Sequence, residues 1–216
     1  MLMTGESTGR SRILAWVAAR SVRQLVLAAG AVVLLVSGAF GGLRQAEPDQ
    51  RPRLVVDEPH VSAPFTITIK GVRWSEDLGE VIGPSEFGRY LLVFADISTD
   101  EDTSVDLYVV KEAVRLQGLK AFKRYSSGVE EVRSELPDPR VVVTEDQVDL
   151  SELGPGLTYE VAFVWEQRTS EPLPSTASVV TRSHQFRQSS LEEERNWFDA
   201  TDDAVGRFPV TKLDVS

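Results

Sequence analysis

The feature that most constrains this chain is an uncharged stretch near its start. From Leu25 to Leu43, nineteen consecutive residues carry no charge, and they are apolar or small. An α-helix rises about 1.5 Å per residue, so this run would reach about 28 Å, close to the hydrocarbon thickness of a bilayer. The sequence therefore predicts a transmembrane helix over residues 22–43 that contacts the lipid bilayer and divides the chain into two unequal parts.

The charges on the two sides of this run predict its orientation. A single acid, Glu6, precedes it, whereas the flank after it has Arg44 followed by two acids. The arginines that precede it are Arg10, Arg12, Arg20 and Arg23. Basic flanks are retained on the cytoplasmic side of a membrane. We therefore expect a cytoplasmic basic arm at residues 1–21 and a single-pass protein of the cell membrane whose C-terminal domain is extracytoplasmic.

A cleaved signal peptide is the alternative reading of the same segment. Its richest apolar part, Leu25 to Val36, is only twelve residues long, and Ser37-Gly38-Ala39 offers small residues at cleavage-type positions. The long basic arm and the apolar residues beyond that site favour a retained signal anchor. Both readings place residues 44–216 outside the cytoplasm.

Charge and composition narrow the function of this external part. Residues 1–43 carry a net charge of +3, so the remaining residues carry −13 of the total of −10. An acidic domain does not attract phosphate backbones, which argues against nucleic-acid binding. The chain has no cysteine, so the domain needs a hydrophobic core of its own rather than disulfides.

Residues 44–64 differ from the rest of the external part. They contain four prolines, many charges and one short apolar patch at Leu54–Val56. Proline fixes φ and removes a backbone donor. This composition predicts an extended Pro-rich linker rather than a folded segment.

From residue 65 to residue 216 the hydrophobic pattern has a period of two, as in half-buried strands. Phe65, Ile67 and Ile69 alternate with polar residues, and Trp74 falls out of phase, which predicts a bulge at Gly71. Further strands are expected at residues 90–97, 105–109, 114–116, 140–144, 158–166, 177–181 and 183–186. Many short strands without a long amphipathic helix predict a mainly β fold, an antiparallel β-sandwich.

The C-terminal extension holds the one segment with a helical pattern. Ser190 can cap a first turn, and the acids that follow it favour the positive end of a helix dipole, which predicts a short helix at residues 190–197. The last apolar residues, Val205, Phe208 and Val210, are expected to rejoin the sheet edge or pack over one end of the sandwich.

Three short motifs connect the chain with a known family. They are VRWSEDLG at residues 72–79, GRYLLVFADI at residues 88–97 and LGPG at residues 153–156, ahead of an alternating strand. With the anchor and the Pro-rich spacer, residues 64–187 resemble the extracytoplasmic immunoglobulin-like β-sandwich domains related to the immunoprotective extracellular proteins of actinobacteria. The resemblance implies an immunoglobulin-like β-sandwich, and it supplies no catalytic or binding residues because many of these domains have no known function.

The residues for nucleophilic or zinc chemistry are sparse. The two histidines, His60 and His184, are far apart in the sequence, and a Gly-x-Ser-x-Gly motif is absent. A triad or zinc site would have to use one of these histidines. We expect His184 to be a solvent-facing residue of a strand, and no catalytic residue or cofactor is predicted.

Acidic residues gather in one place, at the end of the predicted strand over residues 90–97. Their carboxylates could supply the oxygen ligands of a calcium ion, although the EF-hand order of residues is missing. Solvated acids on a turn are the alternative explanation. The candidate ligands are Asp96, Asp100, Asp102 and Asp106.

Two functions fit these observations. The first is a membrane-anchored extracytoplasmic interaction module that binds a protein partner, for example as an accessory subunit of an envelope or transporter complex. Trp197 and Phe198 would form a partner-binding patch if exposed, or would cover one end of the sandwich. The alternative is a secreted or anchored binder of a small ligand, or an enzyme that uses carboxylates. A deep cleft with converging acids would favour this second function.

Overall fold

The computed structural model describes residues 50–79, 82–126, 129–133, 136–189 and 195–213. The chain divides into two compact units, Met1–Gln50 and Arg51–Ser216, and the fold below is that of the second unit. The predicted basic arm at 1–21 and the predicted span at 22–43 lie outside the described residues. Within the described ranges, no helix is long and apolar enough to cross a membrane.

The described part of the second unit is mainly β. Eleven strands form one sheet, β4 and β10 form a separate pair, and α3 is a short helix of six residues. The elements in chain order are β1 (Pro59–Ser62), β2 (Phe65–Ser75), β3 (Gly88–Thr99), β4 (Val105–Asp106), α3 (Leu107–Glu112), β5 (Val114–Gln117), β6 (Phe122–Ser126), β7 (Val129–Arg133), β8 (Arg140–Val143), β9 (Val148–Asp149), β10 (Glu152–Leu153), β11 (Thr158–Arg168), β12 (Thr176–Gln188) and β13 (Arg195–Lys212).

The strand β2 shows why the alternating pattern predicted this fold. Phe65, Ile67 and Ile69 are buried, and the next buried residue is Val72 rather than Gly71. The register with β3 shifts between Ile69 and Gly71, and Gly71 has a φ of +154°. The predicted bulge at Gly71 is confirmed, because a residue without a side chain adopts that backbone angle at little cost.

Two strongly apolar strands, β3 and β11, lie next to each other. β3 pairs with β2 on one side and with β11 on the other, and the β3–β11 ladder runs from Gly88 opposite Arg168 to Ser98 opposite Thr158. Most residues of both strands are buried on both faces. Because neighbours cover both edges and both faces of β3, it is a central strand.

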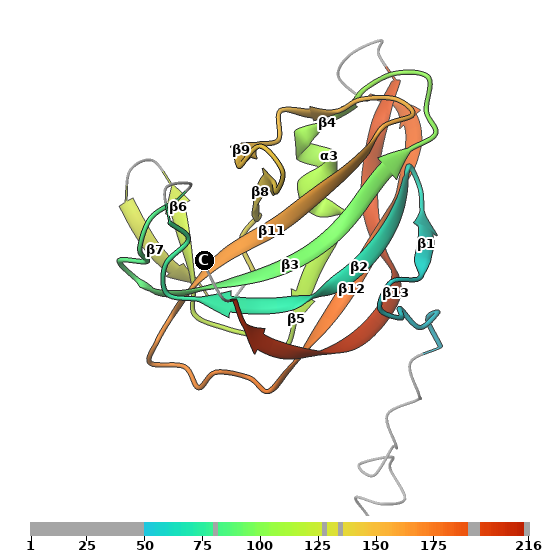
Figure 1. Cartoon of the computed structure of the whole chain (residues 1–216). Coiled ribbons are helices and arrows are strands. Elements are labelled where there is room, and N and C mark those ends of the chain that lie inside the picture. Colours follow the sequence, from blue (N-terminus) through green and yellow to red (C-terminus); the bar gives the residue numbers. More distant parts are fainter. Residues whose placement is uncertain (1–49, 80–81, 127–128, 134–135, 190–194, 214–216) are drawn as a thin grey trace, which may run out of the picture. The chain divides into compact units, whose positions relative to one another are not determined.

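The sheet bends into two facing layers, which gives a sandwich-like arrangement. β5, β12 and most of β13 form one layer, and β2, β3, β11 and β8 form the other (Figure 1). β13 belongs to both, since it pairs antiparallel with β12 and its last residues, Val210 to Lys212, pair parallel with Val72 to Trp74 of β2. The purely antiparallel sheet that we expected is therefore wrong at this corner, where one long strand passes between layers.

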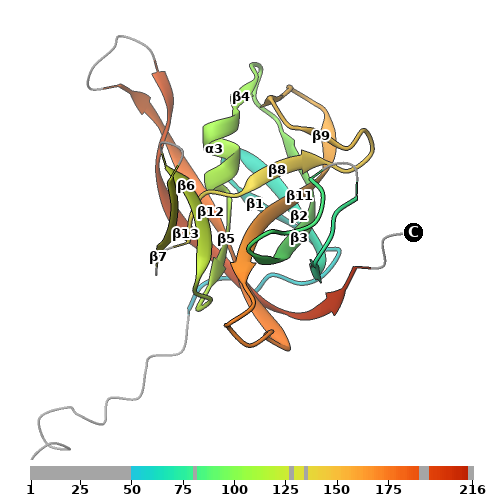
Figure 2. The same ribbon diagram turned by 90° about the vertical axis from the view of Figure 1, so that its left-hand side faces the viewer.

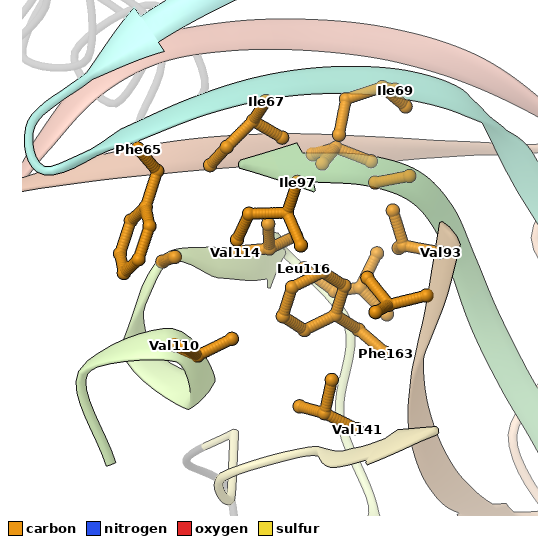
Figure 3. Close-up of a cluster of buried hydrophobic side chains, with 14 of the residues drawn as sticks. Phe65, Ile67, Ile69, Val93, Ile97, Val110, Val114, Leu116, Val141 and Phe163 are labelled. Carbon is orange, nitrogen blue, oxygen red and sulfur yellow. The ribbon is translucent and has the colours of Figure 1, made fainter. Parts of the chain in front are cut away.

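The core fills the space between these layers, with α3 between them at one end (Figures 1 and 2). The largest fully buried side chains include Trp165, Phe163 and Phe208. Figure 3 shows inward-pointing side chains from β2, β3, β5, β8, β11 and α3, among them Phe65, Ile67, Ile69, Val93, Ile97, Val110, Val114, Leu116, Val141 and Phe163.

The predicted strand at residues 105–109 is wrong beyond its first two residues. Leu107–Glu112 form α3, and the carboxylate of Asp106 accepts a hydrogen bond of 2.7 Å from the backbone N–H of Tyr108 at its first turn. Val109 and Val110 are buried side by side, which a strand with one buried face cannot achieve. The cap and the adjacent valines therefore decide the local structure.

Part of the predicted spacer at residues 44–64 belongs to the folded domain. The backbone N–H of Leu54 donates to the carbonyl oxygen of Val205, and the N–H of Val205 donates to that of Pro52, both at 3.0 Å. Leu54 is buried, and β1 pairs with β2. The folded unit thus begins at Arg51 rather than at residue 65, because the apolar patch of the segment finds a place on β13.

The C-terminal region also differs from the expectation. The two predicted strands at 177–181 and 183–186 are one continuous strand, β12. Of the predicted helix at 190–197, residues 190–194 lie outside the described residues and 195–197 belong to β13, which contradicts a helix there. The tail does rejoin the sheet, but β13 lies between β12 and β2 rather than at an edge.

Candidate functional site

The four aspartates of the calcium hypothesis have separate environments. Asp96 forms an ion pair with Lys70 at 2.9 Å, and Asp106 caps α3. Asp100 and Asp102 are exposed on the turn after β3. Within the described ranges, no group of three or more acidic or imidazole side chains is close enough to hold a metal ion. The structure therefore does not bring these carboxylates together as a ligand set.

His60 is part of a polar network on β1. Its Nε2 lies 2.8 Å from Oδ2 of Asp203, and the hydroxyl of Ser62 lies 2.8 Å from the same oxygen. Ser62 also contacts the hydroxyl of Thr181 at 3.0 Å. The serine and the imidazole both contact the carboxylate rather than each other, so this is not the order of a nucleophile–base–acid triad. The network instead fastens β1 to β12 and β13.

The expectation that His184 faces solvent is wrong. Its side chain is fully buried, with its ring edge-on to Phe65 at 6.1 Å and its Nε2 3.6 Å from a carboxylate oxygen of Glu112. Neither ring nitrogen has a hydrogen-bond partner among the described residues. Burial in this environment lowers the pKa of His184 below its usual value, although Glu112 opposes the effect.

A further candidate site is the outer half of the β12–β13 hairpin. We call residues 182–188 and 195–202 the arm; within the described part of the chain no other strand forms a ladder with them, although the backbone N–H groups of Arg182 and His184 donate to the carbonyls of Ala113 and Ala63. Figure 2 shows this orange-red hairpin extending beyond the rest of the sheet. Its register shifts twice near residues 181–185, and Asp199 has a positive φ of 56°. Such irregularities change the direction of a ribbon as it leaves a sheet.

The arm carries aromatic and arginine side chains on both faces. Phe186 and Trp197 are cross-strand partners with ring centroids 5.1 Å apart, and the guanidinium of Arg195 lies 4.6 Å from the centroid of Phe186. On the other face, Arg187 lies 4.6 Å from the centroid of Phe198. Phe186 is 44% exposed. These contacts order a two-stranded ribbon that would be marginal alone.

Trp197 and Phe198 lie between the two placements that their sequence suggested, since they are neither fully exposed nor fully buried. Both are half-buried, and Trp197 packs against the edge of the main core. At the same time, Trp197 forms one surface with the exposed Phe186. Aromatic and arginine side chains are the types that dominate binding energy at protein interfaces. The arm thus presents an ordered group of aromatic and arginine side chains at the surface.

A second candidate site is a cleft of about 480 Å³ beside the C-terminal half of β11. Its walls come from the β2–β3 loop, from residues 137–140 and from β11, and Lys123 and Glu166 are among its lining residues. Their side chains are only 5% and 11% exposed and form an ion pair of 3.2 Å. This volume lies in the range of small-ligand sites.

The carboxylate of Glu166 is fully engaged within the cleft. Besides the ammonium of Lys123, it accepts a hydrogen bond of 2.6 Å from the hydroxyl of Ser85 and one of 3.1 Å from the N–H of Phe87. The hydrogen bonds from Ser85 and Phe87 therefore hold the β2–β3 loop to β11, and the ion pair links β11 to β6. These three donors fix the position of the carboxylate in the cleft wall.

The ion pair has a buried polar neighbour. The guanidinium of Arg89 donates two hydrogen bonds to the side-chain carbonyl of Gln167, at 2.9 and 3.1 Å, and one of 2.7 Å to the backbone carbonyl of Glu171. Burial lowers the pKa of Arg89 below its usual value. This end of the sandwich is held by a satisfied polar network, which makes it rigid.

The sequence pointed to Trp197 and Phe198 of the arm, but not to Phe186, Arg195 or the residues of the cleft. Lys123 and Glu166 are far apart in the chain, and no motif joins them. For the arm, a usable signal existed: Phe186-Arg187 and Trp197-Phe198 flank a polar segment, a pattern that is compatible with a hairpin. The acidic run at 192–194 instead suggested a helix.

The strands of the described part of the chain show that this is a mainly β protein with a sandwich-like arrangement of layers. No family model and no curated protein matches the sequence. Among solved structures, the chain is similar to an uncharacterized beta-sandwich protein from Clostridium difficile 630, with 16% sequence identity and a TM-score of 0.44. The similarity covers 76% of this chain and 97% of that one.

Proposed function

We propose that this protein is a membrane-anchored, extracytoplasmic interaction module that binds a protein partner, as an accessory component of an envelope or transporter complex. The observation that carries this proposal is the arm. Its ribbon extends from the sheet and presents Phe186, Trp197 and Arg195 on one surface. Partner contacts concentrate on such preordered aromatic and arginine residues because they bury large areas at a small loss of conformational entropy.

Site-specific photo-crosslinking in the native membrane tests this role. A photoreactive amino acid replaces Gln185 or Gln188, two exposed arm residues outside the aromatic contacts, and Ser170 is the control position between β11 and β12. We expect a discrete crosslinked product from the arm and none from the control. The product should disappear in a Phe186→Ser, Arg195→Ser double variant. Equal crosslinking from the control position would contradict the assignment.

A matched surface variant separates loss of contact from loss of folding. Leu173→Ala removes another exposed apolar side chain, 39% exposed and outside the arm. We expect this variant to retain the arm crosslink and to melt at the same temperature as the wild type. If Leu173→Ala abolishes the product as well, the arm is not the contact surface.

The location in the membrane is part of the same proposal and rests on residues 22–43. The uncharged run and the basic flank before it support an anchor with a cytoplasmic N-terminus. The test is fractionation followed by protease treatment of intact cells and N-terminal sequencing. A membrane-bound chain with its own N-terminus and an accessible domain would support the anchor. Soluble protein in the medium with a new terminus near Phe40 would show a cleaved signal peptide instead.

We also propose the finer relation to the immunoglobulin-like domains of actinobacteria. Its support is positional, since the motif at 72–79 follows the bulge of β2, the motif at 88–97 lies in β3, and the LGPG motif leads into β11. An experimental structure of such an actinobacterial domain tests it. The same motifs on equivalent strands would support the relation, and a different strand order would contradict it.

A second candidate function, small-ligand binding, is favoured by the cleft. Its volume fits a small ligand, and ionisable side chains near its floor are almost fully buried. Catalysis by paired carboxylates is less well supported, because Glu166 is held by Ser85, Phe87 and Lys123. A thermal-shift screen of the full-length protein with small neutral, cationic and anionic compounds tests this function. A library without any stabilising compound would argue against it.

A further inference from the structure

The charges that line the cleft do not balance. Lys123 and Glu166 neutralise each other, and Arg140 is paired with Asp149, a residue outside the cleft, through hydrogen bonds of 2.5 and 3.1 Å. Two further lining carboxylates remain, those of Glu86 and Asp138. Neither forms a hydrogen bond or ion pair with the described residues.

These two carboxylates come from different walls. Glu86 belongs to the β2–β3 loop, which Glu166 holds in place through Ser85 and Phe87. Asp138 lies between Pro137 and the buried Pro139. Both walls are thus conformationally restricted, and both carboxylates are exposed to solvent. The cleft places two unpaired negative charges around one cavity, which favours a cationic occupant.

The remaining lining groups define the body of that occupant. Ile82, Pro84, Pro137 and Val164 supply aliphatic surface. The two aromatic lining residues, Trp165 and Tyr90, are only 2% and 6% exposed, so neither offers an open ring face, and the indole N–H of Trp165 donates to the carbonyl of Pro137 at 2.9 Å. A flat sugar or base therefore has no aromatic surface to stack on in this cleft. An alkyl chain has aliphatic surface to contact.

We propose that the cleft binds an organic cation, an alkylammonium or alkylguanidinium group whose aliphatic stem lies on the cleft wall between Glu86 and Asp138. This inference rests on the second proposed function, ligand binding at the cleft. The same chemistry has two sources, a free small amine and a basic side chain of a peptide. The experiment below distinguishes these two sources by comparing a free amine with a lysine-containing peptide.

The experiment titrates three probes of equal length and different charge into the ¹⁵N-labelled full-length protein in detergent. They are n-butylammonium, 1-butanol and butyrate, and the backbone amide signals that report binding in the cleft are those of Ile82, Gly83, Ser85, Glu86, Asp138 and Arg140. We expect n-butylammonium to bind most tightly, 1-butanol less tightly and butyrate least. The preference for the cation should weaken as salt is added, because the carboxylates are exposed.

The matched variants keep the size of the side chains and change only their charge. Glu86→Gln with Asp138→Asn should weaken butylammonium binding by roughly three- to tenfold and leave 1-butanol unaffected. The control is Glu145→Gln with Asp146→Asn, two exposed acids of the β8–β9 turn outside the cleft. It should leave all three affinities unchanged. An equal loss in the control would overturn the assignment, since it would show attraction by the acidic surface as a whole.

The other outcomes separate this inference from the function on which it rests. If butyrate or 1-butanol binds in the cleft more tightly than butylammonium, the proposal of a cationic ligand is overturned, while the proposal that the cleft binds a ligand stands. If none of the probes shifts the cleft signals, the proposal of a cationic ligand is overturned. If the compound screen also finds no stabilising compound, ligand binding at the cleft is overturned too. If acetyl-Ala-Lys-Ala-amide binds more tightly than butylammonium, the inference is supported and the source of the cation is a peptide. If it binds more weakly, the inference is supported and the source is a free amine.

Discussion

His184 shows how burial changes a single residue. Its imidazole lies between Phe65 of β2 and Glu112 of α3, and Arg182 is the other charged group beside it. No described residue accepts or donates a hydrogen bond to either ring nitrogen. Burial favours the neutral form of the imidazole and lowers the pKa of His184, and the nearby carboxylate of Glu112 opposes this effect.

This environment predicts a dependence of stability on pH. The unfolded chain binds a proton to this histidine at a higher pH than the folded chain does. The free energy of unfolding is therefore independent of this histidine's protonation above the ordinary imidazole pKa of about 6.5. It decreases as the pH falls below that value. We expect thermal melts of the full-length protein between pH 7.5 and 5.5 to show this decrease.

The variant His184→Leu should reduce the pH dependence. At pH 7.5 we expect it to raise the free energy of unfolding by about 1 kcal/mol, because it removes two unsatisfied buried nitrogens. The same melts measure both effects. A His184→Leu protein that keeps the full wild-type slope would show that another group is responsible.

The acidic turn after β3 gives a second prediction for individual residues. Asp96 is paired with Lys70, and Asp106 is engaged at the first turn of α3. Since these carboxylates already have partners, we expect millimolar calcium to leave the melting temperature unchanged. Differential scanning calorimetry with calcium and with chelator measures this. A clear rise with calcium that disappears in Asp96→Asn would restore the calcium site.

Among the elements, the segment before β1 is held by one close approach. Gly206 of β13 contacts Leu54 so closely that a side chain there would lie 2.8 Å from the Cβ and carbonyl oxygen of Leu54 and 2.6 Å from the ring of Phe208. Real Cβ atoms do not come so near to other atoms, so only glycine lets residues 51–54 dock on the strand.

Gly206→Ala is therefore expected to displace this segment. We expect a loss of about 1–3 kcal/mol in the free energy of unfolding, as for other overpacked positions, and new proteolytic cleavage within residues 51–55. Chemical unfolding and limited proteolysis followed by mass spectrometry check the two effects. Val55→Ala, which removes an exposed side chain of the same segment, is the control and should behave like the wild type.

For the whole molecule, one core connects both layers. Phe163 of β11 is completely buried and packs with Trp165 at a centroid distance of 6.5 Å. Phe163→Ala should lower the free energy of unfolding by about 3–5 kcal/mol, since it removes a buried ring and leaves a cavity. Urea unfolding followed by near-ultraviolet circular dichroism measures the loss. Leu173→Ala, at an exposed site, should change the free energy little.

Several elements could be predicted from local pattern, and others could not. Alternation located β2 and β11, an apolar run located β3, a β-branched run located β8, and the change of phase before Trp74 located the bulge. The alternating residues 105–109 misled the prediction, because a capping aspartate and two adjacent valines favour one turn of helix. The Pro-rich spacer misled it at Leu54, whose burial depends on a glycine far along the chain.

By itself, the sequence determined the mainly β class and the prediction of an anchor, because the period of apolar residues and the length of an uncharged run are local properties. The tertiary structure alone decided the parallel pairing of β13 with β2, the burial of His184, the arm and the cleft. Each of these joins residues that are distant in the chain. Lys123 and Glu166 meet only because β6 and β11 become neighbours in the folded sheet.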